Sequence, residues 1–200
     1  MKILFSLALV SLVAACGSDG AIDSNEAARR AYLGLDGSVG KSIALGFDGF
    51  NAANSANIPP QATTGVGNGT LTISGQVDQG SSANKGMRLE IGMVAYSDGD
   101  FVIDANGNTS VVTYDTGTDV ATQPALDMQL KGIPDGTLDG TLLGTYTMSG
   151  DLAGDADLNL TFTGELQAAG SGTIRSPGTT HITGTMTTPD GGSFVVDITL

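Results

Sequence analysis

Residues 24–53 carry apolar side chains at the spacing of an α-helix. Intervals of three or four residues separate Tyr32, Leu35, Val39, Ile43, Phe47 and Phe50. This spacing places all six on one stripe of a helix. Asp23 or Ser24 can cap its first turn, which also contains Glu26. Glycines inside the segment weaken a helix by about 1 kcal/mol each, so we expect a break within residues 37–40.

From about residue 69 to residue 200 the apolar period changes to two. The alternating positions are Leu71, Ile73 and Val77; Met87, Leu89, Ile91 and Met93; Leu126, Met128 and Leu130; Leu138, Leu142, Tyr146 and Met148; Leu158, Leu160, Phe162 and Leu166; Ile182 and Met186; and Phe194, Val196, Ile198 and Leu200. Such alternation is typical of antiparallel strands with one buried face. Turn sequences such as Asn106-Gly107 separate the runs. Residues 54–68 are expected to form a polar connection without a strand.

Several glycines occupy apolar positions of these strands, and they indicate how the sheet is shaped. They are Gly75, Gly140, Gly144, Gly164 and Gly184. A strand interior tolerates glycine where the sheet bends or where another backbone comes close. The sequence therefore predicts a mainly β domain over residues 24–200. We expect an antiparallel meander of eight or nine strands that forms a curled sheet or barrel, with the N-terminal amphipathic helix packed on its concave face.

The amino terminus has the pattern of a secretion signal. Lys2 precedes a mostly apolar run, Ile3–Val13, which is too short for a bilayer that needs about 20 residues. The sequence Val13-Ala14-Ala15-Cys16 resembles the lipobox of bacterial lipoproteins. The resemblance implies a signal peptide over residues 1–15, cleavage before Cys16, and acylation of its thiol and new amino group. Two or three acyl chains on one residue give stable membrane attachment.

The residues after the lipobox indicate where the domain is held. Gly17 stands where an Asp would imply retention in the inner membrane, so the resemblance implies an outer-membrane location, on the periplasmic face or the cell surface. Residues 16–23 are expected to form a short lipidated tether that keeps the domain close to its membrane.

Composition and charge exclude several classes of function. The chain has 21 acidic and 8 basic residues, and this balance repels nucleic-acid phosphates and anionic lipids. Cys16 is the sole cysteine, so the mature domain has no disulfide framework and no thiol nucleophile.

The few candidate chemical groups have structural explanations. His181 is the only histidine, and no motif supplies a catalytic partner for it. Asp104, Asn106, Asn108 and Asp115 have the spacing of calcium ligands, but Asn106-Gly107 also predicts a tight turn there. Residues 65–69 are rich in glycine and lack the lysine of a phosphate-binding loop. The sequence predicts no enzyme, no cofactor and no metal centre beyond this weak calcium candidate.

Three classes of function remain open. The layout of lipid anchor, helix and curled sheet is similar to that of outer-membrane lipoprotein-localisation factors and mycobacterial lipid-carrier lipoproteins, which implies a non-enzymatic protein that binds a hydrophobic ligand or a partner protein. A ligand carrier would have an apolar cavity lined by Met87, Met93, Met128, Met148 and Phe162. A structural or surface-interaction lipoprotein would have a packed interior instead. An integral outer-membrane barrel is disfavoured because the chain has no Trp and only four Tyr for aromatic girdles.

Overall fold

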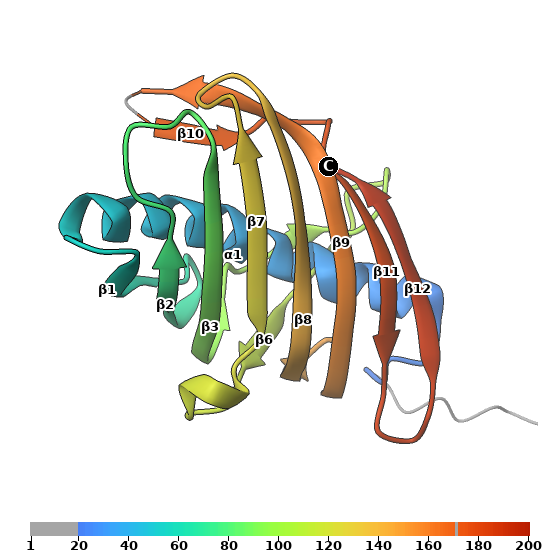
Figure 1. The fold of residues 1–200 in the computed structure, drawn as a ribbon. Coiled ribbons are helices and arrows are strands. Elements are labelled where there is room, and N and C mark those ends of the chain that lie inside the picture. Colours follow the sequence, from blue (N-terminus) through green and yellow to red (C-terminus); the bar gives the residue numbers. More distant parts are fainter. Residues whose placement is uncertain (1–19, 171) are drawn as a thin grey trace, which may run out of the picture.

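The computed structural model describes residues 20–170 and 172–200, and it shows one long helix against a large curled sheet (Figure 1). Helix α1 (Asn25–Ala52) comes first. The strands are β1 (Asn57–Thr64), β2 (Asn68–Val77), β3 (Lys85–Ser97), β4 (Phe101–Val102), β5 (Thr109–Ser110), β6 (Val112–Asp115), β7 (Ala125–Lys131), β8 (Thr137–Gly150), β9 (Gly154–Ala169), β10 (Gly172–Arg175), β11 (His181–Thr187) and β12 (Ser193–Thr199). A short 3₁₀ helix, Val120–Thr122, precedes β7.

The sheet is an antiparallel meander, as the sequence predicts. Its strand order is β1-β2-β3-β6-β8-β9-β11-β12. Strands β6 and β7 lie one after the other between β3 and β8, and each pairs with both of them. Strand β10 pairs with the C-terminal end of β9. Strands β4 and β5 form a separate hairpin. Among the described residues, β1 and β12 each pair on one side only, so the sheet takes the open, curled form.

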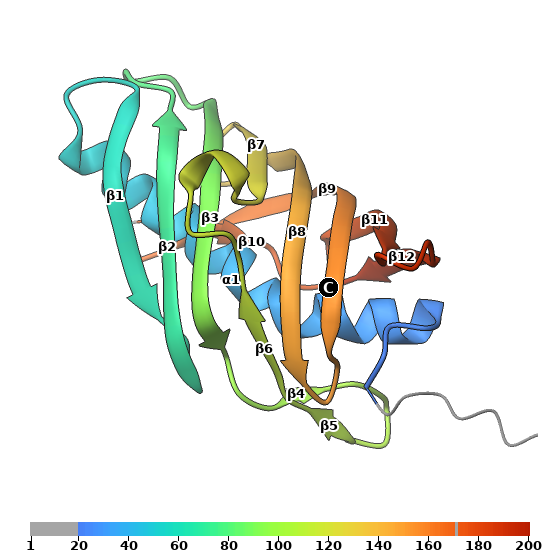
Figure 2. The same ribbon diagram turned by 90° about the horizontal axis from the view of Figure 1, so that it is seen from below.

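Helix α1 crosses the concave face of the sheet from one edge to the other (Figures 1 and 2). At its start, the side chain of Asn25 accepts a hydrogen bond of 2.8 Å from the N–H of Val195 in β12. Near its end, Gly49 lies against Ile58 of β1. The predicted apolar stripe faces the sheet: Tyr32 and Ile43 are at most 1% exposed. Burying such a stripe supplies most of a helix's stability in a folded protein.

The helix is continuous, so the predicted break within residues 37–40 is wrong. Ser24 caps it by accepting a hydrogen bond of 3.2 Å from the N–H of Ala27. Three of its glycines lie where the sheet approaches most closely. A Cβ on Gly34, Gly46 or Gly49 would come within 3.0 Å of a neighbouring side chain. Close packing on the sheet offsets the low helix propensity of these residues.

Two other expectations about the chain path need correction. Residues 57–64 form edge strand β1, which contains Pro59 and Pro60, so the expectation of a polar connection without a strand over residues 54–68 is wrong. Proline is tolerated at a sheet edge because its missing N–H leaves no ladder bond unmade. The second correction concerns the tether predicted over residues 16–23: Ala21 bridges to Ala153, and Ile22 is 6% exposed within the core. The part from Gly20 onward therefore belongs to the domain, whereas Cys16 and the signal lie outside the described residues.

Candidate functional site at the start of the helix

The described chain begins against the turn that joins β8 and β9. The carbonyl of Gly20 accepts a hydrogen bond of 2.7 Å from the N–H of Ala153. The carboxylate of Asp151, in the same turn, accepts the N–H of Val111 at 2.8 Å and the hydroxyl of Ser110 at 3.2 Å. These bonds connect the start of the domain to the turn of the large sheet and to the β4–β5 hairpin.

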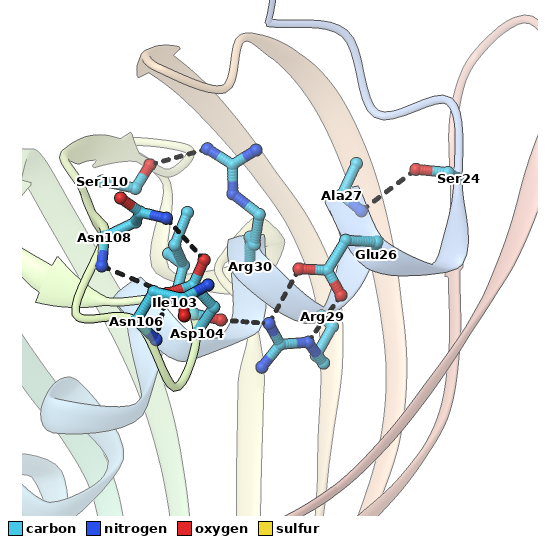
Figure 3. A network of polar contacts seen from close by, with 10 residues as sticks. All are labelled: Ser24, Glu26, Ala27, Arg29, Arg30, Ile103, Asp104, Asn106, Asn108 and Ser110. Atoms are coloured by element: carbon cyan, nitrogen blue, oxygen red, sulfur yellow. Dashed lines mark hydrogen bonds and ion pairs between the residues drawn. The ribbon is translucent and has the colours of Figure 1, made fainter.

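The first turns of α1 hold the β4–β5 hairpin through two arginines (Figure 3). Arg29 donates to both carboxylate oxygens of Glu26, at 2.8 and 2.7 Å, and also to the backbone carbonyl of Ile103 in the hairpin. The hydrogen bond from Arg29 lowers the pKa of the Glu26 carboxyl. Arg30 donates to the hydroxyl of Ser110 at 3.1 Å. The two arginines thus fix the hairpin across the beginning of the helix.

The hairpin turn uses the residues that resemble calcium ligands for its own hydrogen bonds (Figure 3). One oxygen of Asp104 accepts the N–H groups of Asn106 and Asn108 at 2.9 and 3.1 Å, and the other accepts the Asn108 side chain at 2.7 Å. Donation by the Asn108 side chain is the main reason that the pKa of Asp104 is lowered. Asp115 accepts the N–H of Ala95 at 2.7 Å on a different strand. The predicted four residues therefore do not converge on one point, and the turn accounts for their spacing.

A buried ion pair lies halfway along the helix. Arg175 of β10 donates to both carboxylate oxygens of Asp36, at 2.8 and 2.7 Å, and Tyr32 donates its hydroxyl to the same carboxylate at 2.8 Å. Burial raises the pKa of the Tyr32 phenol well above its usual value, and the charge of Asp36 adds to this effect. Burial alone would lower the pKa of Arg175, but its bonds to Asp36 raise it. Arg175 is therefore held by two hydrogen bonds to the Asp36 carboxylate.

A pocket of about 350 Å³ lies beside this ion pair. Its lining includes Asp36, Arg175, Thr180 and the C-terminal Leu200. A second pocket of about 170 Å³ lies between β8, β9 and the turn after β11. The Arg175 guanidinium at the first pocket is already paired with Asp36, so it is not a free cation for an anionic ligand.

The five residues predicted to line an apolar cavity lie in the packed core. Met87, Met93, Met128, Met148 and Phe162 are each at most 3% exposed. Neither of the two described pockets is lined by any of them. The sulfur of Met87 lies only 2.9 Å from the position of a Cβ on Gly46, so helix and sheet are in direct contact there. The helix occupies the space that the cavity hypothesis assigned to a ligand.

The remaining candidates take structural roles. The Nε2 atom of His181 lies 2.8 Å from an Asp197 carboxylate oxygen on the exposed face of the sheet. In the glycine-rich segment 65–69, residues 65–67 form the turn between β1 and β2 and the last two residues begin β2. A Cβ on Gly65 would lie 2.2 Å from the carbonyl oxygens of Asn68 and Ser97. Such close backbone approach requires glycine. Within the described ranges, no group of three or more His, Cys, Asp and Glu side chains is arranged to hold a metal ion.

Comparison with known proteins adds no family to these observations. No protein-family model matches the chain, and neither the curated proteins nor the solved structures contain a match to it. Any function must therefore be argued from the residues themselves.

Proposed function

We propose that this chain is a lipid-anchored bacterial envelope protein, held in the outer membrane through Cys16, whose domain acts by binding a partner protein. The observation that carries the proposal is the sequence Val13-Ala14-Ala15-Cys16 directly after a short apolar run. The pattern agrees with a cleaved lipoprotein signal in the position of the motif, in the length of the apolar run before it and in the presence of a sole cysteine. Gly20, four residues after Cys16, already bonds to Ala153 of the domain, which suits a protein anchored close to its membrane.

The packed interior supports partner binding over ligand carriage. Four methionines and Phe162 that would line a carrier's cavity are in contact with the core, and α1 covers the concave face. Within the described ranges, the structure holds no helix whose length and apolar character suit a membrane crossing. The polar groups near the helix form ion pairs and hydrogen bonds with each other, which is typical of structural fastening.

The anchor is tested by expressing the full chain in a Gram-negative bacterium with a labelled fatty acid. We expect the label in the wild-type protein, and mass spectrometry of the amino-terminal peptide to show an acylated Cys16 as the first residue. Cys16→Ala should lose the label. It should also either leave the membrane fraction or keep its signal peptide uncleaved. The matched control Ser18→Ala should behave as wild type. Labelling of Cys16→Ala would contradict the proposal.

The ligand-carrier alternative is tested separately by native mass spectrometry of the mature chain. The acyl-free protein is obtained in one of two ways. Either the acyl chains are removed enzymatically from protein released from the membrane, or the Cys16→Ala variant is expressed without residues 1–15. We expect the mass of the polypeptide alone, because the interior is filled. A stoichiometric co-purifying lipid would overturn partner binding in favour of a carrier.

A further inference from the structure

Three exposed valines lie at the end of the domain where the described chain begins. Val66, in the β1–β2 turn, is 81% exposed, Val102 of β4 is 59% exposed, and Val111, directly after β5, is 38% exposed. Valine is normally among the more buried residue types. Val94, Val120 and Val195 are also exposed, at 62%, 49% and 51%, so exposure alone does not single out this surface. What distinguishes Val66, Val102 and Val111 is that they lie along the edge of the domain that includes the start of the described chain. We call these three residues the valine end.

Hydrogen bonds place two of the three valines near the start of the chain. Val111 and Asp151 exchange two bonds: the Val111 N–H donates to the Asp151 carboxylate at 2.8 Å, and the Asp151 N–H donates to the Val111 carbonyl at 3.0 Å. The carbonyl of Asp151 lies 3.4 Å from the position of a Cβ on Gly20. Val102 pairs with Thr109 in the hairpin that leads into Val111. These contacts connect two of the valines directly to the first described residues.

Val66 joins the same end through the β3–β4 connection. Its N–H donates to the Asp98 carboxylate at 3.0 Å, and Gly67 donates to the Ser97 carbonyl at 2.9 Å. The chain then runs from Asp98 to Phe101 and Val102. In Figure 2 the turn between β1 and β2, the β4–β5 hairpin and the start of the chain lie along one edge of the molecule.

The hairpin is held so that its apolar side chains point to opposite sides. Phe101 packs on the helix, where its ring lies 2.6 Å from the position of a Cβ on Gly34. Successive residues of a strand point in opposite directions, so Val102 faces away from the helix. Arg29 and Arg30 fasten the hairpin in this orientation. The exposure of Val102 is therefore built into the packing.

We propose that the valine end is the face of the domain that lies against the lipid surface, with Val66, Val102 and Val111 touching the membrane. This inference rests on the proposed anchoring through Cys16. The four residues from Cys16 to Gly20 span at most about 14 Å, so an acylated Cys16 would hold this end next to the bilayer. A lipid surface covers exposed apolar side chains without requiring a partner of matching shape.

The charges at the valine end specify the kind of lipid. Asp98 is paired with Lys41, and Asp100 is exposed. Asp104 binds groups of its own loop, and Asp151 binds the N–H of Val111. Arg29 and Arg30, the nearby cations, are engaged by Glu26, Ile103 and Ser110. Excess carboxylates repel anionic headgroups. We therefore expect the contact to form on zwitterionic lipid and to be weakened by anionic lipid.

The absence of tryptophan from the sequence allows a clean test. The mature chain, residues 16–200, is coupled through its sole cysteine to a maleimide lipid in phosphatidylcholine vesicles. Single-tryptophan variants Val66→Trp and Val102→Trp report on the valine end. Leu143→Trp is the matched control, since Leu143 is 42% exposed but lies on the convex face of β8. Brominated acyl chains in the vesicles quench tryptophans that touch the membrane.

We expect brominated lipid to quench Val66→Trp and Val102→Trp about twofold, with a blue-shifted emission, and to leave Leu143→Trp unchanged. Absence of quenching at both valine positions, or equal quenching at all three positions, would overturn the orientation. Because chemical coupling supplies the anchor, this result does not depend on whether cells acylate Cys16. Failure of the orientation and failure of the proposed anchor are therefore distinguishable.

Discussion

Helix α1 is held on the sheet by two different physical means. Along most of its apolar stripe the contact depends on shape: Tyr32 and Ile43 are fully buried, and Gly34 and Gly46 allow the helix to approach closely. Beside this stripe a charged contact fastens the helix, because Arg175 of β10 pairs with Asp36. A shape contact fails when a side chain is enlarged, whereas an ion pair fails when one partner is removed or neutralised.

The largest effect is expected for the variant Arg175→Leu. It would leave the Asp36 carboxylate, only 20% exposed, with the Tyr32 hydroxyl as its remaining described side-chain donor. An unpaired, mostly buried charge costs about 3 kcal/mol of unfolding free energy, and urea denaturation measures this loss. The double variant Asp36→Leu/Arg175→Leu should recover much of it, since no charge remains unpaired.

A matched control is the exposed pair between Arg88 and Asp78. Their side chains are 42% and 50% exposed, and exposed pairs contribute about 1 kcal/mol or less. Arg88→Leu should therefore change the unfolding free energy far less than Arg175→Leu. Equal losses in the two variants would show that the helix is not held by the buried charge.

The second effect concerns the shape contact and the variant Gly34→Ala. The added Cβ would lie 2.5 Å from the Tyr114 hydroxyl and 2.6 Å from the Phe101 ring. Tyr114 cannot move easily, because it is 1% exposed and donates to the Ala31 carbonyl at 2.7 Å. Overpacking of this kind costs about 2 kcal/mol, which outweighs the gain of about 1 kcal/mol from better helix propensity. Thermal or urea unfolding of the variant should show a net loss, and unchanged or increased stability would contradict the tight contact.

A smaller, pH-dependent effect is expected at Asp98. Burial alone would raise the pKa of this carboxyl, but bonds from Lys41, from the Tyr96 hydroxyl at 2.7 Å and from the Val66 N–H lower it below 3.8. A carboxyl whose pKa is lower in the folded state stabilises the protein fully above the unfolded value of 3.8. This stabilisation is lost as the pH falls through the lower, folded value.

The variant Asp98→Asn removes that pH dependence. We expect a loss of about 1 kcal/mol at neutral pH, and the difference from wild type should shrink as the pH falls below 3.8. Urea denaturation at a series of acidic pH values measures the two curves. Curves that stay parallel down to the acid limit would show that Asp98 titrates alike in the folded and unfolded states.

The elements that the sequence predicts well are those with a long, regular apolar period. The helix lies within one residue of its expected bounds, because its stripe runs over six buried or half-buried positions. Strand β1 was missed because Pro59 and Pro60 resemble a loop, and only pairing with β2 reveals an edge strand. Local pattern cannot report such a partner.

The fastening of the helix was harder to predict than the helix itself. Asp36 is a charged residue close to the apolar stripe in the sequence, but its partner Arg175 lies 139 residues away on the short strand β10. Four residues offer too little periodicity to predict a strand. The valine end was not predicted for a related reason: Val66, Val102 and Val111 come from separate short segments that only the fold brings to one edge of the domain.

The smallest effect separates helix glycines that look alike in the sequence. Gly40 faces the pocket beside Arg175, and a Cβ there would meet only the Arg175 guanidinium, at 3.9 Å, which is an ordinary contact distance. Gly40→Ala should therefore stabilise the protein by up to about 1 kcal/mol, through helix propensity alone, in contrast to the loss expected for Gly34→Ala. Unfolding curves of the two variants, measured side by side, test whether distance to the sheet decides the sign. A loss at Gly40 as large as at Gly34 would mean that backbone flexibility, and not close packing, is what these glycines provide.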